Sequence, residues 1–151
     1  NPENDTMESY HVKIEKDDLL ITKKKLMKLI NLDCDSFNKG LIIRTLPNMK
    51  SKCEQNYDQL NHAYFTNDAI EFIKKLGFNH IIVDTPSIDR YDDNGKLGNH
   101  HLFFNNSHEN TITELTYIDN NIIDGKYFLC LNISNFELDA APSRPIIYSI
   151  L

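Results

Sequence analysis

Two neighbouring histidines and a downstream glutamate are the residues of this sequence best suited to chemistry. His100 and His101 follow a glycine-marked turn, and Glu114 lies in the β-rich segment 111–118. Imidazole nitrogen and carboxylate oxygen suit zinc or manganese, and a catalytic ion needs about three protein ligands and one open position. Because adjacent side chains diverge, we expect at most one histidine of the pair to bind such an ion directly.

The residue types alone also allow structural roles. A histidine pair beside a turn can be a surface feature, and a single glutamate in a strand is commonly exposed. Asp84, which precedes Thr85 and Pro86, can cap a turn through its side chain. If Glu114 is instead half-buried, its carboxylate needs a cation, hydrogen-bond donors or water.

The elements that would position these residues are an alternation of strands and helices. Capping residues and hydrophobic periodicity predict two helices, one after Thr22 and one between Thr66 and Gly77. Strands are predicted at Tyr10–Ile14, Gly40–Leu46, His80–Asp84, 111–118, 126–133 and 144–150, and a loop at Lys50–Tyr64.

The order strand, helix, strand predicts a parallel crossover between Gly40–Leu46 and His80–Asp84. Ligands of such sheets bind at the carboxyl ends of the strands, so the loop Asp84–Asp89 is expected near a site. The closer spacing of the last three strands predicts antiparallel or mixed pairing. Together these patterns indicate an α/β fold.

Composition limits the function classes. The chain has 151 residues, of which 40% are hydrophobic, and this indicates one globular domain, residues 1–151. A formal charge of -6 without a sustained basic face argues against nucleic-acid binding. Three cysteines without a CxxC pair predict reduced thiols. No membrane-spanning stretch or signal-peptide core is recognisable, so we expect a cytoplasmic protein that does not bind membranes.

Several motifs in order resemble one enzyme family. "GFNHIIVDTPSID" is followed by His100, then "TITEL", then "KYFLCLNISNFELDAAPSRPIIYSI". Over roughly Gly40 to Ile150, this order resembles the C-terminal part of the cyclase-like metal-dependent hydrolases, which include bacterial kynurenine formamidase and isatin hydrolase. The resemblance implies a swivelling β/β/α fold with mixed sheets and few helices. It also implies hydrolysis of an amide or ester-like carbonyl in a small-molecule substrate, with at least a dimeric assembly.

The resemblance also implies roles for individual residues. His100 and Glu114 correspond to ligands of the catalytic zinc or manganese ion, His101 is the alternative equivalent of His100, and either histidine is a candidate catalytic residue. Asp84 corresponds to a residue that organises the site around the metal ligands.

The family's principal metal motif, an HxGTHxD-type run, does not occur in this sequence. We therefore expect either that the chain is the C-terminal portion of a longer hydrolase or that it is a non-catalytic binding or scaffold protein with the same fold. A third alternative is a small-molecule-binding module that uses the loop at the strand ends.

Overall fold

The computed structural model describes residues 16, 18–30, 39–58, 60–105 and 107–150. Contacts divide the chain into two compact units, one that ends at Tyr117 and one that begins at Ile118. The strand predicted at Tyr10–Ile14 lies outside the described residues.

Short strands and helices alternate along the first unit, and the second unit contains two longer strands. In chain order, the elements are β1 (Leu20–Ile21), α1 (Lys23–Leu29), β2 (Gly40–Ile43), η3 (Lys50–Cys53), β3 (Tyr64–Phe65), α2 (Asn67–Lys75), β4 (His80–Val83), α3 (Gly98–Phe104), β5 (Thr111–Thr113), β6 (Tyr127–Ile133) and β7 (Ser143–Ser149). The α/β class predicted from the sequence and the few helices implied by the family resemblance are confirmed.

A three-stranded parallel sheet, in the order β2-β4-β5, is the centre of the first unit. The predicted parallel crossover from β2 through α2 to β4 is confirmed. Leu41, Ile81 and Ile112 are register partners across the three strands. They contact one hydrophobic core together with the buried faces of α2 and α3, as the alternation of side chains along a strand requires. A separate parallel pair joins β1 to β3.

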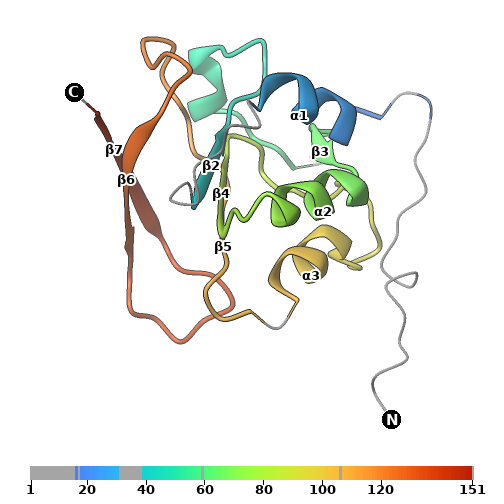
Figure 1. Cartoon of the computed structure of the whole chain (residues 1–151). Helices are drawn as coiled ribbons and strands as arrows, with labels where there is room; N and C mark the ends of the chain where they lie inside the picture. The colour runs from blue at the N-terminus through green and yellow to red at the C-terminus, as the bar shows by residue number, and fades with distance from the viewer. Residues whose placement is uncertain (1–15, 17, 31–38, 59, 106, 151) are drawn as a thin grey trace. The chain divides into compact units, whose positions relative to one another are not determined.

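The helices cover one face of this sheet. Figure 1 shows α2 and α3 side by side next to β4, and the two helices are in contact. Ile70 and Ile73 of α2 and Phe103 of α3 are completely buried in the core. The apolar stripe that predicted α2 is therefore the stripe that packs on the sheet.

Local chemistry explains where the predicted helices begin and end. The hydroxyl of Thr22 accepts a hydrogen bond from the backbone N–H of Lys25 at the start of α1, as expected of an N-cap threonine. Gly77, just after α2, has φ +85°, a left-handed conformation that glycine adopts without strain.

The second unit contains one antiparallel hairpin. Strands β6 and β7 pair antiparallel from Tyr127 with Ser149 to Ile133 with Ser143. Antiparallel or mixed pairing was predicted for the last three β segments, and antiparallel pairing is observed for these two. On one face, Phe128 and Tyr148 are cross-strand partners with ring centroids 6.4 Å apart. Both side chains are largely exposed.

Three elements differ from the sequence prediction. The strand predicted over 111–118 ends at Thr113 and joins β4 in parallel, because Leu115 adopts a left-handed backbone conformation with φ +54°. The run Gly98–Phe104, for which no helix was predicted, forms α3. Lys50–Cys53, inside the predicted loop, forms the short 3-10 helix η3.

Candidate functional site

The position of His100 depends on how α3 begins. Asp89, in the loop after β4, accepts hydrogen bonds from the backbone N–H groups of Asn99 (2.6 Å) and His100 (3.3 Å). These N–H groups lie in the first turn of α3, where they lack partners within the helix. A carboxylate distant in sequence therefore caps the helix that carries His100.

Asn99 attaches the same turn to the rest of the first unit. Its side-chain amide donates to the carbonyl oxygens of Phe65 (2.7 Å) and Ile88 (2.9 Å). Its side-chain oxygen accepts a hydrogen bond from Asn67, at the start of α2. The start of α3 is thus bound to β3, to α2 and to the loop that follows β4.

His100 lies between two carboxylates. Its Nδ1 is 2.6 Å from Oδ2 of Asp89, and its Nε2 is 3.4 Å from Oε1 of Glu114. The same Glu114 oxygen accepts a hydrogen bond of 2.8 Å from the backbone N–H of Ile88. The side chain of Asp89 is only 5% exposed, whereas those of His100 and Glu114 are 21% and 25% exposed.

The environment shifts the pKa of His100 and of Glu114, which are both partly buried. Burial alone would lower the pKa of His100, but the Asp89 hydrogen bond and the nearby carboxylates of Glu114, Asp89 and Asp93 outweigh burial and raise it above 6.5. Burial raises the pKa of Glu114 above its ordinary value, and the charge of His100 and the Ile88 N–H only partly offset this. The pair therefore retains a proton at a higher pH than isolated side chains would.

The same atoms suit a divalent metal ion. Asp89 engages Nδ1 of His100, so Nε2 is the ring atom that faces Glu114. Two ligands of a tetrahedral zinc ion, each about 2.0–2.1 Å from the metal, are roughly 3.3 Å apart, close to the observed 3.4 Å between Nε2 and Oε1. However, the described residues contain no group of three or more histidine, cysteine, aspartate or glutamate side chains placed to hold a metal. Within the described part of the chain, His100 and Glu114 are therefore two fitting donors.

Asp84 has different partners. Its carboxylate accepts hydrogen bonds from the backbone N–H and the hydroxyl of Thr45 and forms an ion pair of 2.7 Å with Lys52. Asp84 follows β4 in the alternation that includes Ile82, so its side chain extends from the sheet face opposite the helices. Its observed contacts attach the end of β2 to η3.

The structure brings His100 and Glu114 together, as the sequence prediction required. His101, the neighbour considered as an alternative, is exposed on α3. The acids of the loop Asp84–Asp89 were candidates from the sequence, but no specific role was predicted for Asp89. An acidic residue after a parallel strand and shortly before a helix could have identified this cap, but that signal requires α3 to be recognised first.

Several solved structures resemble the fold, including the following two. One is a predicted metal-dependent hydrolase from Bacillus stearothermophilus, with a TM-score of 0.59 and 18% identity over 85% of this chain and 57% of the other. The second is a potential metal-dependent hydrolase with cyclase activity, with the same TM-score and identity over 86% of this chain and 58% of the other.

The sequence comparisons add no relative. No family model matches the sequence, and no curated protein matches it. The structural likeness establishes a shared fold, and this chain spans less than three fifths of either solved protein.

Proposed function

We propose that this chain is the C-terminal portion of a cyclase-like metal-dependent hydrolase that acts on an amide or ester-like carbonyl of a small molecule. In this proposal, His100 and Glu114 hold a zinc or manganese ion, and the remaining ligands come from residues outside those described. The reaction class would be hydrolysis of a C–N bond other than a peptide bond. The fold shared with one predicted and one potential metal-dependent hydrolase supports this assignment.

The observation that carries the proposal is the approach of two acceptor atoms. When Nδ1 of His100 donates to Asp89, Nε2 has a lone pair, and this lone pair faces the carboxylate oxygen of Glu114 at 3.4 Å. Two such acceptors repel each other unless a proton or a cation lies between them. The pKa of both groups is raised, that of Glu114 chiefly by burial, so the site favours a bound proton, and a divalent ion would supply the positive charge in its place.

Each of the residues around His100 would have a defined role. Asp89 keeps the proton on Nδ1 of His100 and fixes the orientation of the ring. The Ile88 N–H orients Glu114 through its Oε1. A bound ion would lower the pKa of a water molecule and polarise the substrate carbonyl. If His100 holds the ion, the exposed imidazole of His101 is the candidate that transfers a proton to the leaving group.

Metal binding tests the proposal most directly. Isothermal titration of the purified chain with Zn²⁺ or Mn²⁺ should give saturable binding that a His100→Ala, Glu114→Ala double variant loses. A matched control is the His108→Ala, Glu109→Ala double variant, because this histidine and glutamate are both exposed on the loop after α3. Equal metal binding by wild type and by the His100/Glu114 variant would refute the proposed ligands.

A second experiment separates the two histidines. His101→Ala should leave metal affinity unchanged and, in a protein that contains the remaining ligands, lower the rate of amide hydrolysis. If His101→Ala abolishes metal binding while His100→Ala does not, the ligand is His101.

A non-catalytic protein with this fold is the second candidate. The specific observation in its favour is that the described residues provide two metal donors and no third. This candidate predicts that the longer protein contains no HxGTHxD-type run and shows no turnover with any divalent ion. The presence of that run, together with metal-dependent hydrolysis, would exclude it.

A further inference from the structure

A separate pocket opens at the carboxyl ends of β2, β4 and β5. It has a volume of about 190 Å³ and is formed by residues of η3, of the segment that follows η3, and of the segments that follow β4 and β5. His100, Asp89 and Glu114 are not among its lining residues. Ligands of parallel sheets bind preferentially at this edge, so the position alone favours a binding role.

The ion pair between Lys52 and Asp84 forms the polar wall of the pocket. The ammonium group of Lys52 has no N–H group left for a further partner. The ammonium group of Lys52 donates to the carbonyl oxygen (2.7 Å) and hydroxyl (3.0 Å) of Thr45 and to Asp84 (2.7 Å). These contacts use all three of its N–H groups. Because the Asp84 side chain is only 1% exposed and neutralises Lys52, the wall offers no free charge to an anionic or cationic ligand.

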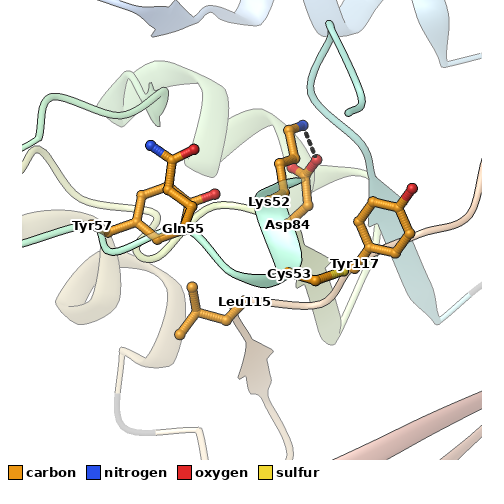
Figure 2. Close-up of a pocket in the computed structure, with 7 residues that line it drawn as sticks. All are labelled: Lys52, Cys53, Gln55, Tyr57, Asp84, Leu115 and Tyr117. Carbon is orange, nitrogen blue, oxygen red and sulfur yellow. Dashed lines mark hydrogen bonds and ion pairs between the residues drawn. The ribbon is translucent and has the colours of Figure 1, made fainter. Parts of the chain in front are cut away.

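The remaining walls combine aromatic rings with neutral polar groups. Figure 2 shows Tyr57 and Tyr117 on opposite sides of the Lys52–Asp84 pair, with Gln55 beside Tyr57. Burial, followed by the nearby Asp84 and Cys53, raises the pKa of Tyr57. Its hydroxyl therefore stays protonated and able to donate at neutral pH.

The backbone at Leu115 is held in an unusual conformation at this pocket. Leu115 has φ +54° and is 62% exposed, which is uncommon for a bulky residue. Hydrogen bonds of 2.9 Å from Leu115 N–H to Thr85 and from Thr116 N–H to Val83 fix this conformation. Strained residues of this kind are concentrated at ligand sites. Here the turn places an exposed leucine on the pocket wall, next in sequence to Glu114.

We propose that this pocket binds a small, uncharged, planar molecule of the aromatic or heteroaromatic carboxamide class. The ring would lie against the tyrosines and Leu115, and the amide would exchange hydrogen bonds with the Gln55 side chain and the Tyr57 hydroxyl. The pocket volume of about 190 Å³ admits about one substituted ring. Pockets that bind drug-sized ligands have larger volumes. This proposal does not depend on the metal site.

Protection of Cys53 from alkylation provides the test, because this exposed thiol lines the pocket. Iodoacetamide labelling of the whole chain is followed for each cysteine by mass spectrometry, with benzamide, benzoate or benzylamine present. Saturating benzamide should slow labelling of Cys53 at least fivefold and leave Cys130, in β6, unchanged. No protection by benzamide, or equal protection by benzoate, would overturn the proposal.

Variants connect the effect to the pocket. Tyr57→Ala should abolish protection, whereas Tyr91→Ala, which removes an exposed tyrosine outside the pocket, should preserve it. Leu115→Arg places a charge at an exposed lining position where folding is not at risk, and should also abolish protection. If it preserves protection, the proposal fails.

An independent measurement separates this pocket from the metal site. Benzamide should raise the thermal unfolding midpoint of the wild type, and equally that of the His100→Ala, Glu114→Ala variant. A rise that this variant loses would place benzamide at the metal site and overturn the assignment to this pocket.

Discussion

At the scale of single residues, Asp89 performs two tasks with one carboxylate. It caps α3 through two backbone N–H groups and holds the ring of His100 through Nδ1. Because the carboxylate is almost completely buried, these donors are its only compensation for the loss of water within the described contacts. Helix geometry and imidazole orientation are therefore coupled at this position.

The coupling predicts the effect of Asp89→Asn. The amide retains one acceptor oxygen but loses the charge and places an N–H group near the donors, so the variant should lose about 2–4 kcal/mol of unfolding free energy. The pKa of His100 should fall, because the Asp89 hydrogen bond and charge both raise it. Chemical denaturation and NMR titration of the His100 ring measure the two effects.

Asp92→Asn is the matched control for this change, since Asp92 is exposed in the same loop. It should alter stability by less than about 0.5 kcal/mol. If Asp89→Asn is equally neutral, the contacts of Asp89 do not hold α3 and His100 in place.

Leu115 permits a second prediction at the residue scale. Glycine adopts φ +54° without the clash that a side chain causes. Leu115→Gly should therefore be neutral or stabilising by up to about 1 kcal/mol, despite the greater freedom of glycine in the unfolded chain. Met49→Gly is the control: Met49 is equally exposed at 62% but has φ -87°, so the change should cost about 0.5–1 kcal/mol. Thermal or chemical denaturation compares the two, and an equal loss would show that Leu115 is not strained.

At the scale of elements, sequence patterns predicted the helices and strands that are determined by residues close together in the sequence. The stripe of α2, its stop at Gly77, and the apolar strands β2 and β4 follow from periodicity and capping. α3 could not be predicted in this way. It has only seven residues, and its first turn is capped by Asp89 from outside the helix.

The approach of His100 to Glu114 likewise depends on how the elements pack against each other. The spacing of the two residues in the sequence does not encode this packing. It requires α3 to pack on α2 and requires the chain to turn at Leu115 after β5. The family resemblance predicted the pair, because proteins with a common fold share the packing that brings such residues together. It did not name Asp89, whose role depends on the position of a helix that local patterns do not show.

His80 makes β4 sensitive to pH. Burial lowers its pKa below 6.5, so below pH 6.5 the unfolded chain binds this proton more readily than the folded protein does. Since stability rises with pH where the unfolded state binds more protons, the His80 contribution should be constant above about pH 7.5 and should weaken as the pH falls through 6.5.

The variant His80→Gln isolates this contribution, because all other titrating groups remain. Its amide can retain a hydrogen bond to Thr111, the partner of His80 Nδ1. The unfolding free energy of wild type minus that of the variant should decrease between pH 7.5 and 5.5, as measured by urea denaturation. An increase over this range would mean that the folded state raises the pKa of His80.

At the scale of the whole molecule, the two units differ in how much buried hydrophobic packing stabilises them. The first has a hydrophobic core in which two helices cover a parallel sheet. The second has a two-stranded hairpin with an exposed aromatic pair, an arrangement that is marginally stable by itself. No helix among the described residues is long and apolar enough to cross a membrane. We propose that the hairpin contributes to the homo-oligomer expected from the family resemblance.

Hydrogen exchange tests both the difference in stability between the two units and the proposed association through the hairpin. Amides of Ile81, Ile82 and Val83, in the buried β4 strand, should exchange at least about a hundredfold more slowly than those of β6 and β7 at low protein concentration. If copies associate through the hairpin, raising the concentration should slow exchange in β6 and β7 without affecting β4. A Phe128→Ser, Tyr148→Ser variant should remove that concentration dependence. Hairpin protection equal to that of β4 at every concentration would contradict both parts, because the hairpin would then unfold only with the core.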